Sequence, residues 1–384
     1  MPELVVDWLK LTPERVQTIA DICHRLAAMG GPCVSLSDSS SGGGDYHTRP
    51  VGVMGFIYEA FPDLGAIASA LSIRTGNAMI LKGGDAASRT NQIIASILQS
   101  TLADVGLSEL LVFPVASTEI SHLDVAQCSE IDLIIAHGRP SLVEQILQQA
   151  SVPVIPSRMG NCYLYWSASG SLDQVYQMIV ESHSGTPDAV NRIEKVLLHE
   201  AHSENAITRL WNRLQEVGFT IKLDESLVQS LGLDARSSDT SHSSTQHPAS
   251  HSPASHSPTS HSPTNHSPTS HNLVAVDSPE WDSAYLKKIL AFRQVKDGAA
   301  AINWINAHSS GHADSIVTGD YTESRRFIAK CRSSSVYVNA SPRFVRNAHQ
   351  TEEIALGMSN HKRAAGGLIG MALMRQRQRI FHGC

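Results

Sequence analysis

The chain has 384 residues, a formal net charge of −6 and a hydrophobic fraction of 42%. The negative net charge argues against nucleic acid as a main partner. The sequence contains neither a run of about 18 apolar residues nor a signal-peptide pattern. We therefore expect a cytoplasmic protein of about two domains that binds neither nucleic acid nor membranes.

Six cysteines are spread along the chain without any C-x-x-C pair: Cys23, Cys33, Cys128, Cys162, Cys331 and Cys384. This spacing argues against a disulfide framework and against a cysteine-rich zinc site. We expect reduced thiols in ordinary packing, and we assign no metal ligand.

Strand and helix patterns alternate along the first half of the chain. Residues 51–60 and 78–83 predict buried strands, and residues 90–106 predict an amphipathic helix. The apolar stripe of that helix consists of Ile94, Ile97 or Leu98, Leu102 and Val105. Short apolar strands follow in "LLVFPV", "IDLIIAHG", "VPVIP" and "CYLYW", with amphipathic helices between and after them. Such repetition is typical of a parallel sheet covered by helices.

The same alternation resumes near residue 185, where a polar loop leads into the strand "KVLLHE". Further strand and helix patterns include "ITRLWNRLQEVG", "FTIKL", "LVAVD", "ILAFRQV", "DSIVTGD" and "SVYVNA". The pattern predicts two α/β units. An enzyme of this design places its chemistry in the crevice between them.

Residues 236–272 are a low-complexity insert built on the repeat H-S-P-x-[SN], and they carry seven of the 19 histidines. Regular prolines and hydroxyl side chains predict a disordered segment. The alternative is metal capture, since imidazole binds zinc, copper and nickel. Its ligands would be His251, His256, His261, His266 and His271. The five-residue period does not match the three-residue turn of polyproline II, so we favour the disordered loop.

Several segments in a fixed order carry a family likeness: "GNAMILKGGDAASRTNQ", "SVPVIPSRMGNCYLYW", "TPDAVNRIEKVLLHE" and "HADSIVTGDYTESRRFIAKC". Together they resemble gamma-glutamyl phosphate reductase, a branch of the aldehyde dehydrogenase superfamily. The resemblance covers almost the whole chain. It implies an α/β, aldehyde dehydrogenase-like fold of two parallel-sheet domains with a small oligomerisation element.

The alternation of strands and helices divides the chain near residue 185, and the resemblance implies the roles of the two parts. We place a dinucleotide-binding-type domain at residues 1–185, to which residues 346–384 return. A catalytic-type domain occupies residues 186–345, and the insert at 236–272 interrupts it. The first residues resemble a family segment that normally follows an additional helical stretch, so we expect a divergent and N-terminally short member.

The implied activity is the NADPH-dependent reduction of gamma-glutamyl phosphate to glutamate 5-semialdehyde, with release of phosphate. In this mechanism a Cys thiolate displaces phosphate, and the resulting thioester accepts hydride from the cofactor. The family's nucleophile lies three residues after a Pro and directly before an Asn. Here that frame reads "PDAVN", so Val190 stands at the position of the nucleophile and Asn191 follows it.

Three residues near this frame are weaker alternatives as nucleophiles. Attack by Asp188 would give an anhydride, and His183 precedes the loop. Cys162 aligns with a family cysteine that is not the nucleophile, so we expect a packed thiol. No intact catalytic residue is therefore assigned.

The segments that handle substrate in the family also differ. The family's E-A-R-P-N turn reads "EAFPD", so Phe61 replaces an arginine and Asp63 replaces an asparagine. We expect Asp63 to repel an acyl phosphate. The family's P-R-G-G stretch reads "AHGRPS" at residues 136–141, which disfavours close approach of the backbone to a ligand. "NASPRF" is retained, and it supplies Asn339 and Arg343 as candidate substrate-binding residues. Arg343 can hold phosphate as a planar fork or brace its own loop.

The retained segment "GNAMILKGG" lies along the cofactor's adenosine ribose in this superfamily. We assign cofactor binding to Asn77, Lys82, Gly83 and Gly84, with NADP as a weakly bound or vestigial cofactor. The alternative is that the glycines serve the turn and that Lys82 is solvated.

Two functions follow from these patterns. The favoured one is a pseudoenzyme that lacks reductase chemistry and acts as a regulatory or assembly partner, in a homo-oligomer or in a hetero-oligomer with an active paralogue. The alternative is an active NADPH-dependent reductase with altered chemistry. A third hypothesis, a metal-responsive interaction protein, depends on the His-rich insert.

Overall fold

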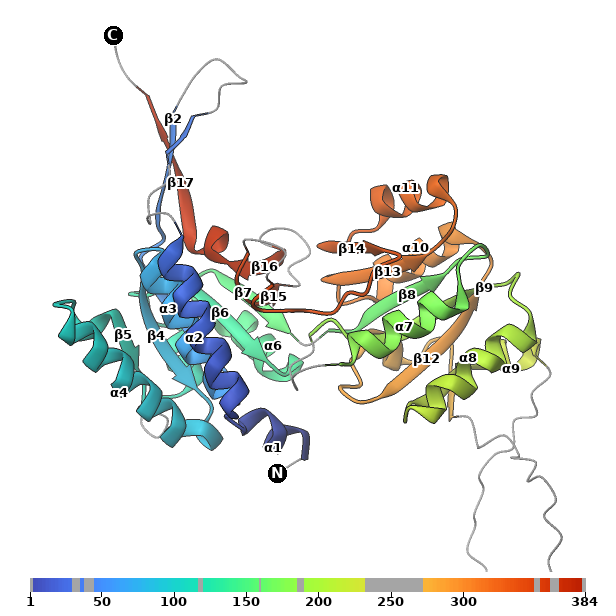
Figure 1. Cartoon of the computed structure of the whole chain (residues 1–384), viewed down its shortest axis with the longest axis horizontal. Coiled ribbons are helices and arrows are strands. Elements are labelled where there is room, and N and C mark those ends of the chain that lie inside the picture. The colour runs from blue at the N-terminus through green and yellow to red at the C-terminus, as the bar shows by residue number, and fades with distance from the viewer. Residues whose placement is uncertain are drawn as a thin grey trace, which may run out of the picture.

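The computed structural model describes residues 3–29, 35–37, 45–116, 120–158, 160–184, 190–231, 272–348, 353–359 and 366–381. Two α/β domains, each built on a parallel sheet, lie beside each other along the long axis of the molecule (Figure 1). The insert at 236–272 lies outside the described residues apart from Asn272. Its disorder and its metal binding therefore stay predictions.

The first domain contains a parallel sheet in the order β5-β4-β3-β6-β7. Its strands are β3 (Val53–Tyr58), β4 (Ala78–Gly83), β5 (Val112–Pro114), β6 (Leu133–Gly138) and β7 (Val154–Arg158). β3 and β4 confirm the strands expected at 51–60 and 78–83. Successive residues of β3 face opposite sides of the sheet, so Phe56 and Ile57 belong to different core clusters.

Helices cover both faces of this sheet (Figure 1). One side carries α2 (Pro13–Ala28), α3 (Pro62–Arg74) and α4 (Ser88–Asp104), and the other carries α5 (His122–Ala126) and α6 (Pro140–Gln149). The short elements α1 (Glu3–Leu9), η1 (Asp85–Ala87) and η2 (Glu109–Leu111) complete this part. α2 begins at Pro13, after Thr12, whose hydroxyl accepts a hydrogen bond from the backbone N–H of Arg15.

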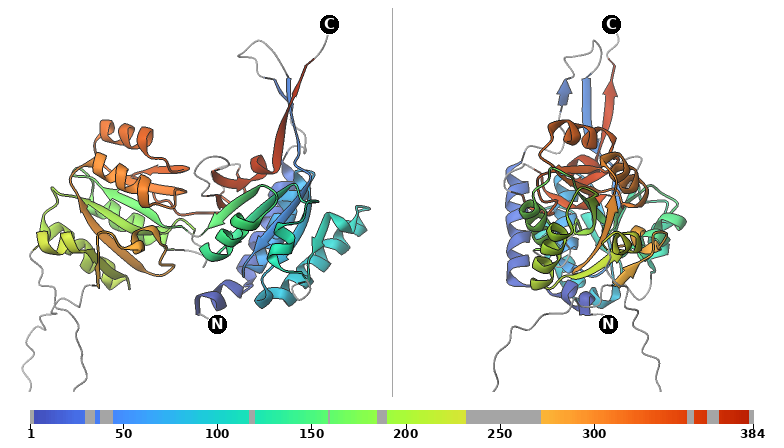
Figure 2. Two further views of the ribbon diagram at one scale, coloured as in Figure 1. Left: turned by 180° about the vertical axis from the view of Figure 1, so that it is seen from behind. Right: turned by 90° about the vertical axis from the view of Figure 1, so that its right-hand side faces the viewer.

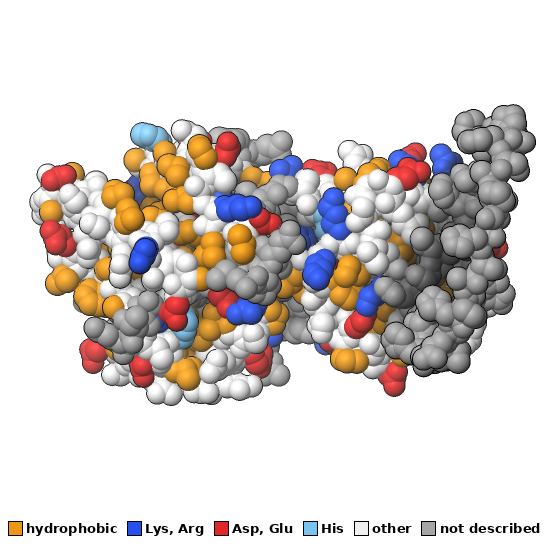
Figure 3. All heavy atoms as spheres, turned by 90° about the horizontal axis from the view of Figure 1, so that it is seen from below, with side chains coloured by type: hydrophobic (Ala, Val, Ile, Leu, Met, Phe, Trp, Pro, Cys, Tyr) orange, Lys and Arg blue, Asp and Glu red, His pale blue; other side chains and the backbone are white. Residues whose placement is uncertain are grey.

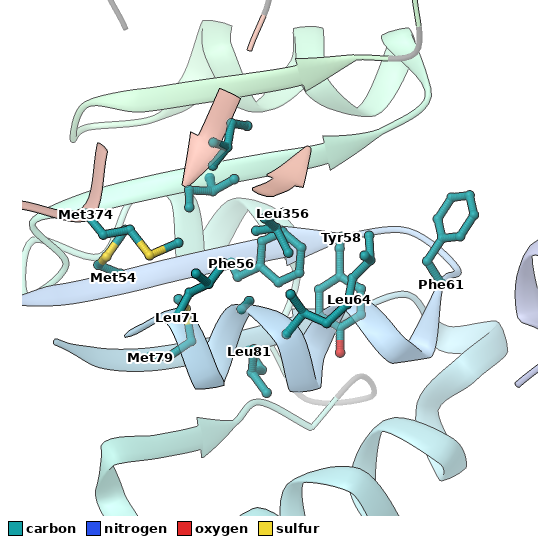
Figure 4. Close-up of a cluster of buried hydrophobic side chains, with 14 of the residues drawn as sticks. Met54, Phe56, Tyr58, Phe61, Leu64, Leu71, Met79, Leu81, Leu356 and Met374 are labelled. Atoms are coloured by element: carbon teal, nitrogen blue, oxygen red, sulfur yellow. The ribbon is translucent and has the colours of Figure 1, made fainter. Parts of the chain in front are cut away.

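The core of the first domain lies between α3 and the sheet (Figure 4). The buried side chains drawn there include Met54, Phe56, Tyr58, Leu64, Leu71, Met79, Leu81, Leu356 and Met374. Full burial of one large apolar side chain contributes about 1.5–3 kcal/mol. Because Leu356 and Met374 join this cluster, the C-terminal segment packs against the first domain.

The C-terminal segment contributes strands to two small antiparallel sheets. β15 (Ala355–Ser359) pairs with β16 (Gly367–Gly370), and η4 (Met371–Met374) leads into β17 (Arg375–Ile380). β17 pairs with β2 (Asp45–Pro50), which pairs in turn with β1 (Ser35–Ser37). This three-stranded sheet projects from the body of the molecule (Figure 2), in the form of the small element that the family resemblance implied.

The second domain contains seven parallel strands in the order β11-β10-β12-β9-β8-β13-β14. They are β8 (Cys162–Trp166), β9 (Ile193–His199), β10 (Thr220–Asp224), β11 (Asn272–Val274), β12 (Ile289–Val295), β13 (Ala313–Val317) and β14 (Ser335–Val338). One face carries α7 (Leu172–Ser182), α8 (Glu204–Glu216) and α9 (Glu225–Ser230), and the opposite face carries α10 (Gly298–His308) and α11 (Tyr321–Lys330). η3 (Pro279–Asp282) precedes β12.

The boundary between the two sheets differs from the one expected at residue 185. β8 and α7 belong to the second domain, so the chain passes between the sheets after β7 and before β8. The sequence predicted this strand and this helix correctly. Apolar periodicity does not identify a strand's neighbours in a sheet. It therefore did not show that β8 and α7 belong to the second domain.

α4 confirms the helix expected at 90–106, but its buried stripe differs from the expected one. Ala95 and Leu102 are buried and Leu98 packs against the core, whereas Ile97 is 61% exposed and Val105, beyond the helix end, is 67% exposed. Hydrophobic side chains are visible at the surface of the first domain, on the left of Figure 3.

Candidate active site

Val190 lies in the turn that leads into β9, at the amino edge of the second sheet. Its side chain is fully buried. Its carbonyl oxygen accepts hydrogen bonds from Gly160 N at 3.1 Å and from His312 Nε2 at 2.7 Å. This packing requires glycine at 160, because a Cβ there would lie 1.9 Å from the His312 ring. A buried apolar side chain in a fixed turn thus occupies the position that the resemblance assigns to the nucleophile.

The structure brings Asn191 and Arg343 to this turn. Asn191 is buried, and its Nδ2 donates a hydrogen bond to the carbonyl of Pro342 at 2.9 Å. Arg343 follows directly and is exposed, and its guanidinium makes no hydrogen bond or ion pair with any residue that the structure describes. Arg343 is therefore available to an anion.

Asn339 has a structural role in the fold, and its contact with substrate stays a prediction. It follows β14 with a φ of +53°, a conformation that asparagine adopts more readily than most residues. Its Oδ1 accepts from Thr318 N at 2.9 Å, and its Nδ2 donates to Thr318 O at 2.8 Å. These bonds tie the ends of β13 and β14 together, so the side-chain amide is already engaged.

Cys162 is not arranged as a nucleophile. The residue is fully buried, and its Sγ lies 3.5 Å from His312 Nε2. Burial raises the pKa of the Cys162 thiol well above its usual value, and the charge of Asp314 raises it further. Because the thiolate is the reactive form, burial disfavours Cys162 as a nucleophile. A packed thiol is what the sequence indicated.

His183 is also committed to packing. Its Nε2 donates to Ile193 O at 2.8 Å, and its ring meets that of Phe219 edge-on at 4.8 Å. Burial lowers the pKa of His183 to about 4. Asp188, the third alternative nucleophile, lies outside the described residues.

Two adjacent buried ionisable residues, Glu194 and Lys195, follow this turn, and the motifs of the sequence did not single them out. Glu194 accepts hydrogen bonds from the backbone N–H groups of Tyr285 and Leu286, and burial raises its pKa to about 7. Lys195 Nζ lies 3.6 Å from the centroid of the Tyr285 ring and donates to Ser283 O at 3.1 Å. Burial lowers the pKa of Lys195 to about 8. The available signal was two adjacent charges inside an apolar strand.

The first sheet reverses its strand order between β3 and β6. In open α/β sheets, nucleotides bind at such a point, outside the carboxyl ends of the strands. Here Glu59 follows β3 and Arg139 follows β6. Arg139 donates to the Glu59 carboxylate from its backbone N–H at 3.1 Å, from Nε at 2.9 Å and from the end of the guanidinium. An ion pair therefore bridges the two strands at this point.

Both groups of this pair are charged at neutral pH. Burial would raise the pKa of Glu59, but hydrogen bonds and charge from Arg139 outweigh it and hold that pKa below its usual value. The same hydrogen bonds raise the pKa of Arg139. Gly138 has a φ of +155°, and a Cβ there would lie 3.0 Å from the Glu59 Cβ. The "AHGRPS" backbone thus packs closely against the chain's own carboxylate.

Lys82 and its two glycines lie at the carboxyl end of β4, on the same edge of the sheet as Glu59. Lys82 is buried, and burial lowers its pKa against the opposing charges of Asp85 and Asp124. A Cβ at Gly83 would lie 2.1 Å from Asn91 Nδ2, so this glycine serves internal packing. A Cβ at Gly84 would lie 3.5 Å from Ala60 N and 3.6 Å from Glu59 Cα, which is ordinary van der Waals contact, so packing alone does not require this glycine.

Asn77 lies at the opposite end of β4 from Lys82 and is almost fully buried. Its Oδ1 accepts from Gly52 N, and its Nδ2 donates to Thr75 Oγ1 and to Met374 O, each at 2.8 Å. Both amide protons are therefore used. The geometry corrects the assignment of Asn77 as a cofactor contact, because the side chain fastens the C-terminal segment to β4.

Asp63 does not present a free negative charge to a ligand, which corrects a second expectation. It is buried and paired with the guanidinium of Arg15 from α2. Phe61 stacks on Trp8 with ring centroids 5.0 Å apart, and its backbone N–H donates to Trp8 O at 3.2 Å. The altered "EAFPD" turn is thus a docking surface for α1 and α2.

No group of three or more His, Cys, Asp or Glu side chains that could hold a metal ion occurs within the described ranges. In the same part of the chain, no helix is both long and apolar enough to cross a membrane.

Comparison with known proteins identifies the family. The model of the aldehyde dehydrogenase family matches residues 14–352. The protein "Gamma-glutamyl phosphate reductase 2" of Synechocystis sp. is 37% identical over 387 residues, covering 99% of this chain and 83% of the relative. The chain belongs to the gamma-glutamyl phosphate reductase family. A gamma-glutamyl phosphate reductase of Gloeobacter violaceus is 27% identical over 394 residues, covering 100% of this chain and 83% of that protein.

A solved structure of the family supports the fold. The crystal structure of gamma-glutamyl phosphate reductase from Thermotoga maritima superposes with a TM-score of 0.79 at 23% identity, covering 100% of this chain and 85% of the other. The expected aldehyde dehydrogenase-like fold class is confirmed. Family membership and fold are therefore established, whereas the assignment of Val190 to the position of the nucleophile stays a prediction from the sequence.

Proposed function

We propose that this chain is a gamma-glutamyl phosphate reductase homologue without normal reductase activity, which acts in the cytoplasm as a regulatory or assembly partner. The proposal rests on Val190. A reductase of this family would form a thioester at that position, and a valine side chain has no lone pair with which to attack an acyl phosphate. The raised pKa of the neighbouring Cys162 thiol supports the same conclusion.

The cofactor region supports weak, vestigial binding of NADP. Lys82 and Gly84 fit the ribose or the 2′-phosphate of the adenosine half. Glu59 does not fit a pyrophosphate, because its charged carboxylate lies at the reversal of strand order and engages Arg139. Bound NADPH would supply hydride. The residues of this chain favour contact with its adenosine half only.

The alternative is an active NADPH-dependent reductase of L-glutamate 5-phosphate with altered chemistry. The observation that favours it is the exposed guanidinium of Arg343 beside Asn191, which is placed to hold a phosphate. An active enzyme would also need a nucleophile, and residues 185–189 of the loop lie outside the described part of the chain.

Intact-mass measurement separates the two functions. The protein is incubated with glutamate semialdehyde and NADP⁺ without phosphate, so that an acyl group formed on a nucleophile is not released by phosphate. We expect an unmodified mass. A family member with Cys at the position of Val190 is the positive control. A glutamyl adduct on this protein, mapped to one residue, would establish the alternative.

The assembly role is tested by co-expression with a cysteine-bearing reductase from the same source. We expect this chain to form oligomers, and to elute in a mixed oligomer in which the reductase rate differs from that of the reductase alone. Separate elution with an unchanged rate would refute a role as partner of the active paralogue.

A further inference from the structure

The second domain contains a crevice at the end of its sheet opposite to Val190. Val190 precedes β9, whereas the crevice is lined by His199 at the carboxyl end of that strand. A strand of this length spans about 20 Å. The crevice is therefore separate from the candidate active site.

The topology of the sheet produces this crevice. β8 and β13 are neighbours, yet the chain leaves β8 toward α7 on one face and leaves β13 toward α11 on the other. Loops that diverge in this way leave a hollow outside the carboxyl ends of the strands, where open α/β sheets bind ligands. The hollow has a volume of about 390 Å³, which is within the range of small-molecule sites.

Three carboxylates line the crevice: Asp297 caps α10, Asp320 caps α11, and Glu323 lies in the first turn of α11. Asp297 precedes α10, and its Oδ1 accepts from Ala300 N at 2.8 Å. Glu323 of α11 accepts from Thr318 Oγ1 at 2.6 Å and from Tyr165 Oη at 3.3 Å. A carboxylate has about four acceptor positions, so both groups retain capacity for a ligand's donors. These carboxylates favour an ammonium group.

The crevice also presents a cation and an apolar floor. Arg326 lines it and is exposed, and its guanidinium has no hydrogen bond or ion pair with any residue that the structure describes. Ile302, Ile316 and Phe327 line the interior and are largely buried. A ligand of opposite charges at one end and an apolar stem at the other would match both features.

We propose that this crevice binds a small zwitterion, an amino acid with a short apolar side chain. Asp297 and Glu323 hold the ammonium group, Arg326 holds the carboxylate, and the side chain lies on the apolar floor. This proposal does not depend on the loss of reductase activity, because the crevice and the Val190 turn lie at opposite ends of β9.

Gly298 provides the space between the two carboxylates. A Cβ at this position would lie 3.2 Å from Glu323 Oε1 and 3.6 Å from the Tyr165 ring. Gly298 is the first residue of α10, and alanine has the higher helix propensity there. Gly298→Ala therefore narrows the site without weakening the helix.

Calorimetric titration of the full chain with three matched probes tests the proposal. Norvaline carries both charges, n-butylammonium lacks the carboxylate, and pentanoate lacks the ammonium group. We expect saturable binding of norvaline about tenfold tighter than that of either partial probe, the effect of one hydrogen bond to a charged group. Norvaline binding no tighter than the partial probes would overturn the proposal.

Paired variants assign the two charges. Arg326→Gln should reduce norvaline affinity to that of n-butylammonium and leave n-butylammonium unchanged. Asp297→Asn combined with Glu323→Gln should lower the affinity for norvaline to that for pentanoate, which lacks the ammonium group. The first turn of α10 should stay capped, because asparagine caps as well as aspartate. Gly298→Ala should weaken all three probes without lowering the melting temperature.

Two control variants locate the site. Arg325→Gln removes a neighbouring exposed guanidinium that does not line the crevice. Arg343→Gln removes the free guanidinium of the candidate active site. Neither should change norvaline binding. A loss of binding in Arg343→Gln, with none in Arg326→Gln, would place the amino acid at the Val190 turn and refute the crevice.

Discussion

Val190, Cys162 and His312 form one buried cluster at the amino edge of the second sheet, where β9, β8 and β13 begin. His312 Nε2 lies within 2.7 Å of the Val190 carbonyl and 3.5 Å from the Cys162 sulfur. A branched hydrocarbon at 190 is compatible with this cluster, because it needs no hydrogen-bond partner when it is buried. His312 fixes the backbone of the turn through its hydrogen bond to the Val190 carbonyl.

Glu194 predicts a pH dependence of stability. Its pKa is about 7 in the folded protein against 4.5 as the usual value. A raised carboxyl pKa stabilises the fold below the unfolded pKa, and this contribution is lost as pH rises through about 7. Between about pH 5 and pH 7, we expect the free energy of unfolding to fall more in the wild type than in Glu194→Gln. Urea unfolding measures the difference.

The exposed Glu216, at the end of α8, supplies the matched control for this experiment. Glu216→Gln should follow the pH dependence of the wild type. If Glu194→Gln follows it as well, Glu194 is not the titrating group.

At the scale of elements, the sequence predicted strands and helices better than it predicted their neighbours. β4 and β12 coincide with the apolar runs that indicated them. Asn77 and Asn339 were assigned to ligands because they occur in retained motifs. Their hydrogen bonds to Met374 and Thr318 join segments that only the folded chain brings together. No local pattern carries that information.

The pair of Arg15 and Asp63 fastens α2 to the turn before α3. Arg15→Met leaves a buried carboxylate without its partner and should cost about 3–5 kcal/mol of folding free energy. Adding Asp63→Asn should recover part of this loss, because the unpaired charge is then removed. A double-mutant cycle by urea unfolding measures the coupling, and additive effects would show that the two groups do not interact.

Replacing either residue of the pair Glu59 and Arg139 should change the affinity for NADPH, in opposite directions for the two residues. Glu59→Gln frees the guanidinium and removes a negative charge, so it should tighten NADPH binding. Arg139→Gln leaves the carboxylate alone and should weaken it. Each change is about fivefold or more if a phosphate of the cofactor lies at this point. Fluorescence titration measures both affinities. Equal effects of the two variants would show that the ion pair lies away from the cofactor.

At the scale of the whole molecule, the family and fold class followed from motifs along the full chain, but the domain boundary did not. β8 follows the first sheet in sequence and lies inside the second in space. The crevice beside α10 and α11 was also not foreseen, because its lining residues come from four separate segments. Such sites arise from topology and not from any single motif.

The His-rich insert lies outside the described residues apart from Asn272, so the prediction that it is disordered rests on the sequence. Hydrogen exchange should show almost no protection across residues 236–271 and strong protection of β9. Comparable protection of the two would refute a disordered insert. Nickel or zinc titration of the chain with and without residues 241–271 tests the alternative of metal capture.

The proposed loss of covalent chemistry is tested most directly by phosphate-dependent oxidation of glutamate semialdehyde, the reverse of the family reaction, followed as NADP⁺ reduction. The unmodified protein should not exceed the uncatalysed rate, because no thiohemiacetal forms at Val190. Val190→Cys should restore little, because Phe61 and the altered "AHGRPS" stretch would still misplace the acyl phosphate. A misplacement of about an ångström costs ~10²-fold in rate. Rapid cofactor reduction by the unmodified protein, abolished by replacing another residue such as Cys162 or Asp188, would contradict the assignment and identify an active enzyme.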